Sequence, residues 1–367
     1  MSLDRFKVPK EEEVRVSEAA LRRVVTSIFE KLRVSSSDAT EAAEALVTSD
    51  LRGVESHGVS NMFRIYVKDY QEGRLNSAPG WKVLRETAAI AVIDAERRLG
   101  IIMGPRAMRL AVEKAKRVGV GVVTVRNSGH FGAIGHHAMI AAEQDMVGVC
   151  TAGAGTPKVS VVPTFSAEPL FGTNPIAVAA PAQKEAPFLF DVATSAIAGN
   201  KIRLAVRTGA PLLPGWVADK QGNLLTEETP VQDRHQFHLL PLGGTREQGS
   251  HKGYGLMMTA EILASLLSGG LPNMLDDSAG SKAHFAAYDI SAFTDLEGFK
   301  RDMDRMLQKL QNAKPVAGQE RVLYPGLPEH EAIQERRSQG IPLHKEVIRW
   351  FENITKELNI PGLEILP

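Results

Sequence analysis

Residues 119–138 read Gly-Val-Gly-Val-Val-Thr-Val-Arg-Asn-Ser-Gly-His-Phe-Gly-Ala-Ile-Gly-His-His-Ala, and this stretch decides the fold. Its apolar, β-branched beginning predicts a buried strand over residues 119–125, and a helical pattern over 133–145 follows a glycine-spaced turn. His130 lies in that turn. A helix start offers free backbone N–H groups and a positive dipole end beside a side chain that titrates near neutral pH. The turn is therefore the first candidate site, and a capping or core histidine is the alternative.

Strand and helix patterns alternate on both sides of this stretch. A helix is expected over residues 105–118, with Pro105 in its first turn. The order strand–helix–strand–helix–strand favours an α/β fold with a central sheet that is largely parallel or mixed. The expected strands share short apolar runs flanked by turn residues: 88–94, 119–125, 147–151, 175–180, 187–191 and 284–289.

Both ends of the chain are helical by pattern, at residues 17–51, 61–72, 296–310, 328–339 and 344–358. The simplest organisation is a discontinuous helical domain made of residues 1–78 and 295–367. It packs as one layer beside an α/β domain of residues 79–294 that binds cofactor and substrate. A strongly apolar helix over 254–267 is expected in the interior.

Composition argues against several classes of function. The chain has 43 basic residues (Lys plus Arg) and 43 acidic residues (Asp plus Glu), so its formal net charge is zero. This balance argues against nucleic-acid binding, and it leaves little electrostatic repulsion between copies of the chain. Cys150 is the single cysteine, so no internal disulfide is possible and a cytoplasmic location is expected. No apolar run reaches the roughly 18 residues of a membrane span, and the first residues do not resemble a signal peptide.

Known nucleotide-binding motifs fail on their residues and context. The segment Gly153-Ala-Gly-Thr-Pro-Lys lacks the third glycine of a Rossmann fingerprint and does not begin a helix. The segment 244–249 has P-loop spacing, but Ser250 stands where the lysine belongs. A second helix start, at residues 250–255, carries Lys252 and suits a phosphate or pyrophosphate. A solvated surface lysine is the alternative.

Three other positions carry candidate chemistry. His57 follows a helix end, and Arg52 lies five residues before it. Arg52 could hold a substrate carboxylate, or it could only be a charge at the helix C-terminus. Asp191 ends a buried strand, where a carboxylate meets a ligand or caps the next helix. Since His136 and His137 point about 100° apart on a helix, a metal is not expected there, and both are assigned to the helix surface or an interface.

Seven segments in this order resemble the malate/L-lactate dehydrogenase family that lacks a Rossmann domain. The resemblance runs from about Glu18 to Leu343. The segments are Asp50-Leu-Arg-Gly-Val-Glu-Ser-His-Gly-Val, Asn127-Ser-Gly-His-Phe-Gly-Ala, Gly172-Thr-Asn-Pro-Ile-Ala, Phe190-Asp-Val-Ala-Thr-Ser, Gly215-Trp-Val-Ala-Asp, His251-Lys-Gly-Tyr-Gly-Leu and Tyr324-Pro-Gly.

The resemblance implies an NAD- or NADP-dependent oxidoreductase of a 2-hydroxy or 2-oxo acid, with a non-Rossmann topology and a homodimeric assembly. Within it, a reductase of a cyclic imine carboxylate and a non-catalytic homologue remain as alternatives. Carried over, His130 is the acid and base, and His57 and Arg52 lie in the substrate region. The residues implied for the cofactor are Asp191, Val192 and Ala193 along it, Lys252 and Gly253 at its phosphates, and Gly326 close to the dinucleotide.

The chain departs from the family pattern at four places, all near expected ligand contacts. Asn61 stands where many members carry an arginine, with Arg64 one helical turn further on. Val161-Val-Pro-Thr-Phe-Ser replaces Val-Val-Pro-Phe-Gly-Gly, the loop 151–157 is longer, and 245–249 looks inserted. These departures concern the substrate more than the class of reaction.

Overall fold

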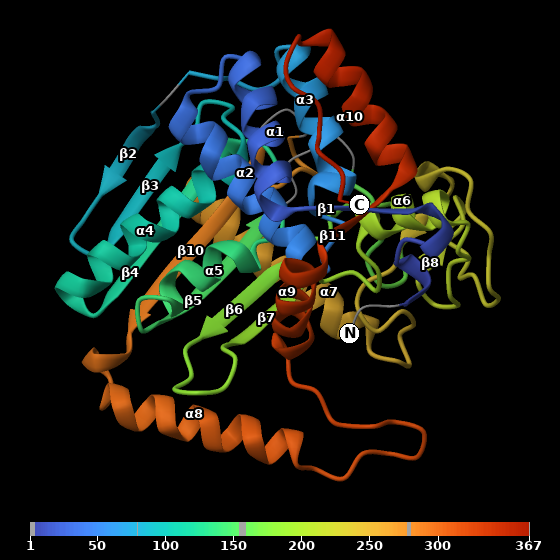
Figure 1. The fold of residues 1–367 in the computed structure, drawn as a ribbon. Coiled ribbons are helices and arrows are strands. Elements are labelled where there is room, and N and C mark those ends of the chain that lie inside the picture. The colour runs from blue at the N-terminus through green and yellow to red at the C-terminus, as the bar shows by residue number, and fades with distance from the viewer. Residues whose placement is uncertain (1–3, 79, 154–158, 277–279, 367) are drawn as a thin grey trace.

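The structure, a computed structural model, describes residues 4–78, 80–153, 159–276 and 280–366. A seven-stranded sheet lies beside a layer of helices that comes from both ends of the chain (Figure 1). Within the described residues the strand order is β2-β3-β4-β10-β5-β6-β7. Their bounds are β2 (Lys82–Glu86), β3 (Ile90–Asp94), β4 (Val120–Ser128), β5 (Met146–Gly153), β6 (Ile176–Ala180), β7 (Phe188–Val192) and β10 (Ser281–Asp289).

The sheet is mixed, which confirms one of the two predicted arrangements. In the described part of the chain, β3 and β4 pair in parallel, and every other neighbouring pair is antiparallel. A largely parallel sheet is not formed because β10, from late in the chain, inserts between β4 and β5. The polar edge strand β2 has no apolar run and was not expected from the sequence.

The carboxyl ends of three strands meet at one edge of this sheet. Strand β10 runs antiparallel to both β4 and β5, so those two share a direction. Two antiparallel steps from β5 through β6 give β7 the same direction. The carboxyl ends of β4, β5 and β7 therefore lie on one side of the sheet, where ligands bind in open α/β sheets.

Two helices connect the central strands, α4 (Gly100–Val118) and α5 (Gly135–Ala142). Helix α4 begins five residues before its predicted start, so Pro105 lies inside it and not in its first turn. A Cβ on Gly100 would come within 2.6 Å of the carbonyl oxygens of Gly129 and His130. Because Gly100 has no side chain, the first turn of α4 can pack against the distant turn around His130. The local sequence pattern does not reveal this contact, and the predicted helix start is therefore too late.

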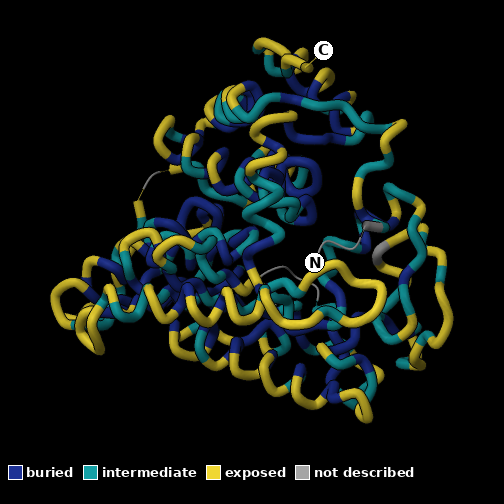
Figure 2. The backbone as a smooth tube through the Cα atoms, turned by 60° about the horizontal axis from the view of Figure 1, so that its bottom comes forward, coloured by how far each residue is buried: buried dark blue, intermediate teal, exposed yellow. Residues whose placement is uncertain are grey.

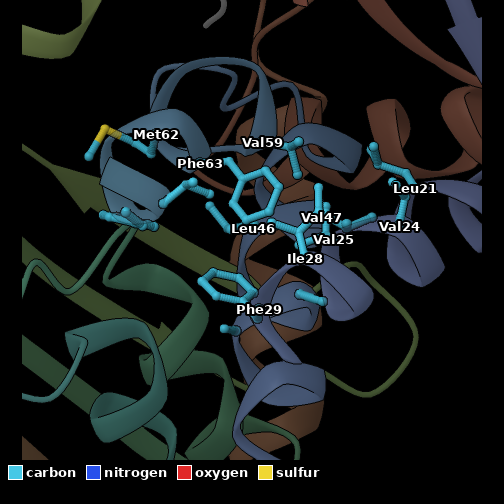
Figure 3. Packing of buried hydrophobic residues seen from close by; sticks show 14 of the residues in the cluster. Leu21, Val24, Val25, Ile28, Phe29, Leu46, Val47, Val59, Met62 and Phe63 are labelled. Atoms are coloured by element: carbon cyan, nitrogen blue, oxygen red, sulfur yellow. The ribbon is translucent and has the colours of Figure 1, made fainter. Parts of the chain in front are cut away.

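The helical layer joins the two ends of the chain around one core. It contains α1 (Glu18–Lys31), α2 (Ser36–Leu51), α3 (Arg64–Gln71) and α10 (Lys345–Glu357), and β1 (Glu13–Val16) pairs with β11 (Ile341–His344). Phe29 and Phe63 pack at 5.0 Å between ring centroids among aliphatic side chains of α1 and α2 (Figure 3). Phe351 from α10 completes the same core. The predicted helical layer from both ends is thus confirmed.

The remaining elements flank the sheet: α6 (Gly199–Thr208), β8 (Val217–Ala218), β9 (His238–Leu239), α7 (Ser250–Ala264), α8 (Leu296–Gln311) and α9 (Leu327–Gln339). Met303 and Leu307 of α8 pack with Ala180 and Tyr324, apart from the core that the two chain ends share. Figure 1 shows α8 along the far side of the molecule from α10. The division into residues 1–78 with 295–367 and 79–294 stays a prediction.

The apolar sequence over residues 254–267 predicted an internal helix. This prediction is wrong, because one side of α7 is exposed. Its exposed side includes Leu256, Met258 and Ile262, which are 41%, 43% and 48% exposed. Along the outer helices, exposed stretches of backbone alternate with buried ones that face the interior (Figure 2). The described helices include none with the length and apolar character needed to cross a membrane.

Candidate functional site

The turn after β4 is fixed by the start of α4. The Ser128 hydroxyl and the Gly129 N–H both donate to the Arg98 carbonyl, at 2.9 and 2.7 Å. Gly129 faces Leu99 closely, as Gly100 faces the turn from the other side. Backbone contacts thus hold His130 at the edge where the strands end.

Two donors point at one nitrogen of His130. The Gly132 N–H donates to Nδ1 at 3.2 Å, and the Tyr66 hydroxyl oxygen lies 2.7 Å from the same atom. A backbone N–H can only donate, so Nδ1 accepts and the proton of the neutral ring lies on Nε2. Tyr66, which is 1% exposed on α3, was missed by the sequence analysis because a buried tyrosine in a helix resembles any core residue.

His57 stacks on His130, as expected for two residues of one site. Their ring centroids are 5.8 Å apart and the planes are inclined by 16°. The Ser56 hydroxyl lies 2.9 Å from Nδ1 of His57, and the Asn200 side-chain nitrogen lies 3.5 Å from its Nε2. Strand β4, the α2–α3 connection and α6 thus contribute to one polar group.

The loop that carries His57 is anchored on a buried carboxylate. Asp50, at the end of α2, accepts from the Val59 N–H at 2.5 Å and from the Ser60 hydroxyl at 2.6 Å. Gly58 leaves the space that this carboxylate fills, because a Cβ there would overlap it. Burial raises the pKa of Asp50 to about 7, against the effect of the Ser60 hydroxyl.

A buried ion pair fixes the same loop from α9. Arg336 Nη2 lies 2.6 Å from Glu55 Oε1, with both side chains 9% exposed. Arg336 also donates to the Asp50 carbonyl. Removing one partner of such a pair leaves an uncompensated charge, so this contact makes the loop rigid.

Both stacked histidines are neutral at neutral pH. Burial, together with the charges of Arg203 and His137, lowers the pKa of His130 to about 4. Burial lowers the pKa of His57 to about 3, with contributions from His130 and Lys201. The cations Lys201 and Arg203 therefore lie close enough on α6 to act on this pair, and neither was singled out in the sequence.

Asp191 closes the other end of the glycine turn. Its Oδ2 accepts from the Gly135 N–H at 2.7 Å, so it caps α5 and not the next helix in the sequence. Burial of its carboxyl group raises the pKa of Asp191 to about 6, although other atoms of the residue are exposed. Gly135 lies five positions after His130, a span of at most about 18 Å along the chain.

Arg52 acts on Asp191 in this structure. It is the C-terminal cap of α2, and its positive charge acts on Asp191 and His136, while Glu329 of α9 acts on it in turn. Burial lowers the pKa of Arg52. The expected site residues thus form two groups at the two ends of one turn. One is the histidine pair, and the other is the Arg52–Asp191 pair, which joins a residue expected in the substrate region to one expected at the cofactor.

The positions expected at the cofactor differ in what they contact. Val192 and Ala193 lie half-buried at the end of β7, beside Asp191. Lys252 is exposed in the first turn of α7, where no side chain caps the helix. This arrangement fits a phosphate group.

The two expected glycines have packing roles. A Cβ on Gly253 would overlap the Leu242 backbone, and one on Gly326 would lie 2.8 Å from the Leu189 nitrogen. Both glycines therefore allow close approach of the chain to itself, and whether they also contact a dinucleotide stays a prediction.

His137 corrects the expectation of a surface position for the histidine pair on α5. It is fully buried, and its Nε2 lies 2.8 Å from the Phe131 carbonyl oxygen. Gly104 makes this possible, because a Cβ there would lie 2.5 Å from that nitrogen. His136 is half-buried. Over the described ranges, no three His, Cys, Asp or Glu side chains are grouped so that they could hold a metal ion.

The four departures from the family pattern fall in different places. The Asn61 amide donates to the Ser56 and Asn200 carbonyls, at 3.0 and 3.2 Å. Phe165 is 88% exposed with a φ of 71°, in a turn closed by Ser166 N–H and the Pro163 carbonyl. Residues 245–249 form the turn before α7. The loop 151–157 and the glycine segment 153–158 lie mostly outside the described residues.

Comparison with known proteins gives one consistent result. Residues 16–352 match the family described as malate/L-lactate dehydrogenase. The malate dehydrogenase of Pyrococcus horikoshii is 36% identical over 356 residues, which cover 95% of this chain and 97% of that protein. A solved structure of malate dehydrogenase from the same organism superposes with a TM-score of 0.87, covering 97% of this chain and 99% of that one.

Two further relatives have other names. The L-sulfolactate dehydrogenase of Methanocaldococcus jannaschii is 32% identical over 345 residues, covering 92% of this chain and 96% of that protein. The structure of the delta1-piperideine-2-carboxylate reductase from Pseudomonas syringae pvar. tomato is 28% identical with a TM-score of 0.76. It covers 93% of this chain and 99% of that one.

Proposed function

This chain belongs to the malate/L-lactate dehydrogenase family, and from that premise we propose that it is an NAD- or NADP-dependent dehydrogenase of a small 2-hydroxy acid. The observation that carries the proposal is His130, held at the strand ends with its Nε2 left for a substrate oxygen. Reduction of the corresponding 2-oxo acid is the reverse reaction. A bound nicotinamide supplies the hydride to C2 in reduction and receives it in oxidation.

His130 is the group that moves the proton. In reduction the imidazolium gives its Nε2 proton to the carbonyl oxygen and keeps the proton on Nδ1, which the Tyr66 oxygen accepts. In oxidation the ring must first carry its single proton on Nδ1, in place of the Nε2 position that it has in the free protein, and the unprotonated Nε2 then takes the hydroxyl proton. Because a hydroxyl both donates and accepts, Tyr66 stays bonded to Nδ1 in either state. Such acid–base assistance contributes roughly 10²–10⁴-fold to the rate.

An anionic substrate raises the pKa of His130. The pKa of His130 is about 4 in the free protein because burial and the Arg203 charge favour the neutral ring. A carboxylate bound beside the ring opposes the charge of Arg203 and raises this pKa. The 2-oxo acid therefore brings the imidazolium form toward neutral pH when it binds, and His57, stacked on the ring, fills the other side of the site.

The Arg52–Asp191 pair and the start of α7 are assigned to the dinucleotide. Asp191, Val192 and Ala193 lie at the end of β7, on the edge where β4 delivers His130. Lys252 would hold a phosphate through its charge at the positive end of the α7 dipole. Arg52, next to Asp191, is available to a carboxylate or a phosphate at the boundary between the two groups.

The exposed apolar side of α7 supports a homodimer. Exposed aliphatic side chains follow one another from α7 into the next turn: Leu256, Met258, Ile262, Leu266, Leu267, Leu271 and Leu275. Apolar patches of this kind mark protein interfaces. A second copy covers this face in the proposed assembly. The single buried cysteine supports a cytoplasmic location.

One substrate panel tests the proposal. Reduction of 2-oxo acids and oxidation of 2-hydroxy acids are measured with both cofactors, by nicotinamide absorbance. His130→Gln should lower kcat at least 100-fold, while NADH or NADPH still raises the melting temperature. His330→Gln, on α9, is the control and should keep wild-type turnover. Near-normal turnover by His130→Gln contradicts the assignment, and no turnover of any acid by the wild type contradicts the function.

A cyclic imine carboxylate is the second candidate, since one structural relative bears the name of such a reductase. It has the same carboxylate and the same proton requirement, with nitrogen in place of the carbonyl oxygen. Turnover of the imine above that of every 2-oxo acid in the same panel would favour it. A protein that neither turns over these compounds nor binds either cofactor would be the non-catalytic homologue.

A further inference from the structure

The peptide group between Phe131 and Gly132 joins two histidines. Its carbonyl oxygen lies 2.8 Å from Nε2 of His137, and its N–H donates to Nδ1 of His130 at 3.2 Å. A trans peptide is planar, with its oxygen and its N–H on opposite sides, so the two rings bind one rigid unit from its two ends. Within the described residues, these two hydrogen bonds are the ones that this peptide makes.

The partner of His137 locates the proton on its ring. A carbonyl oxygen only accepts, so Nε2 of His137 donates, and in the neutral ring Nδ1 then carries no proton. Burial lowers the pKa of His137 to about 3, which keeps this ring neutral near pH 7. Its Nδ1 is buried without a hydrogen-bond partner in the described structure. His137 therefore binds the protein through one nitrogen, as a donor to the peptide.

Close packing holds the His137 ring against this carbonyl. The side chain is fully buried, and Phe285 of β10 lies edge-on to the ring with centroids 5.8 Å apart. On the side of α4, Gly104 provides the space, because a Cβ there would lie 2.5, 2.6 and 2.7 Å from three ring atoms. Helix α4 and strand β10 thus fix the position of the donor.

At the other end of the peptide, the Gly132 N–H restricts His130. The Tyr66 hydroxyl also lies at Nδ1, but it can turn and accept when that nitrogen carries a proton. A backbone N–H cannot accept, and it repels a protonated Nδ1. The peptide therefore favours the ring with its proton on Nε2, and hydrogen bonds in series strengthen one another.

We propose that His137 is a positioning residue for His130: it holds the Phe131–Gly132 peptide with its N–H at Nδ1, and it thereby fixes the proton of the resting ring on Nε2. For turnover, this inference rests on the proposed dehydrogenase function, in which oxidation needs that proton on Nδ1. A donor held at Nδ1 also favours the neutral ring. His137 therefore moves the protonation of His130 to lower pH.

Other titratable and charged groups act on the two rings. They are His57, Tyr66 on α3 and Arg203 on α6 at His130, and His136 on α5, Arg109 on α4 and Glu41 on α2 at His137. Arg109 and Glu41 pair with each other through two bonds of 2.8 and 2.7 Å, so their charges largely cancel. Substitutions at residues 104 and 137 leave all six groups in place.

Two substitutions of similar size separate the donor from the packing. His137→Leu removes the donor, whereas His137→Gln keeps an N–H that can reach the carbonyl. With isotope-labelled histidine at pH 7.5, the nitrogen NMR signals of His130, identified by their loss in His130→Gln, report which nitrogen carries the proton. We expect Nε2 in the wild type and in His137→Gln. In His137→Leu, the ratio of the Nδ1-protonated to the Nε2-protonated ring should rise about fivefold, the equivalent of one hydrogen bond.

The pH profile of kcat/KM is the second readout. His137→Leu should raise the apparent pKa of His130 by about 0.7 unit, and His137→Gln should keep the wild-type value. Gly104→Ala pushes the unchanged His137 ring from the carbonyl, so it should shift both readouts as His137→Leu does, and it replaces that variant if His137→Leu does not fold. His284→Leu is the matched control. Its ring also has a buried Nδ1 without a partner in the described structure, but it lies on the opposite face of β10 from Phe285, so neither readout should change.

Three outcomes would overturn the inference. A wild-type ring with its proton on Nδ1 contradicts the assigned hydrogen bond. Unchanged signals in both His137→Leu and Gly104→Ala would show that the peptide needs no donor to stay in place. Equal shifts in His137→Leu and His137→Gln, or a shift in His284→Leu, would assign the effect to packing. Because the NMR readout needs no turnover, a wild type that reduces no acid contradicts the proposed function alone.

Discussion

The Tyr66 hydroxyl is the closest polar partner of His130 in the described structure, 2.7 Å from Nδ1 and 64 residues away in the sequence. The hydroxyl is the polar group of the Tyr66 side chain, and the ring packs among core residues of the helical layer. Burial raises the pKa of this phenol, so the hydroxyl stays protonated. It therefore orients the imidazole without taking a charge itself.

Tyr66→Phe removes that hydrogen bond and little else. We expect kcat to fall about fivefold, since one hydrogen bond contributes about 1 kcal/mol. The pH profile of kcat should shift as well, while the melting temperature stays near that of the wild type. Tyr70→Phe is the control: its ring packs edge-on against Phe29, with centroids 6.1 Å apart, away from His130. Unchanged kcat and pH profile in Tyr66→Phe would remove Tyr66 from the mechanism.

The turn Pro163–Ser166 has a bulky residue at a position with positive φ. The Ser166 N–H donates to the Pro163 carbonyl at 2.9 Å, and Phe165, the third residue of the turn, has a φ of 71°. A turn with positive φ at this place favours glycine, which the family carries there. A bulky side chain in this conformation costs about 1–3 kcal/mol.

Phe165→Gly should stabilise the protein. The side chain is 88% exposed, so its removal loses little packing. Relief of the backbone outweighs the entropy that glycine adds to the unfolded chain, for a net gain of about 1 kcal/mol. Urea denaturation measures the difference. Phe165→Ala keeps the penalty and should show no gain; equal stabilities of the two variants would assign another cause.

Close glycine contacts also explain where sequence patterns misplaced helix boundaries. Gly100 and Gly104 let α4 approach the His130 turn and His137. Neither contact leaves a signal in the local periodicity, because a glycine that permits close packing looks the same as one that ends a helix. The strands β3, β4, β6 and β7 were predicted well, since short apolar runs between turn residues are local features.

For the molecule as a whole, buried histidines make stability depend on pH. Burial lowers the pKa of five histidines to about 3 or 4: His57, His130, His136, His137 and His284. The unfolded chain binds protons at these positions below about pH 6.5, which the folded protein does not. Asp50 and Asp191 act in the opposite sense, with pKa values raised to about 7 and 6.

We therefore expect the free energy of unfolding to fall as the pH falls from about 6.5 to 4. Each histidine not offset by a carboxyl contributes about 1.4 kcal/mol per pH unit in that range. Urea denaturation at pH 7.5, 6 and 5 checks this, and His284→Asn should reduce the slope by about one proton. Constant stability over the same range would show that these side chains remain hydrated in solution.

The assembly can be tested on the exposed face of α7. Ile262→Asp combined with Leu267→Asp places two charges among side chains that are 48% and 56% exposed in the single chain. We expect light scattering to give the mass of two chains for the wild type and of one chain for the variant. Val316→Asp, at a position 74% exposed after α8, is the control. A monomeric wild type would refute the homodimer.

The sequence alone determined the glycine turn, its histidine and the family. Backbone and side-chain patterns within about 20 residues encode a strand, a turn and a helix, and several such patterns in order identify relatives. The tertiary structure decided what surrounds the turn: Tyr66 and Arg203 at His130, Arg52 at Asp191, and β10 between β4 and β5. The pKa of an imidazole and the partner of a carboxylate depend on neighbours in space, and only the folded chain brings those neighbours together.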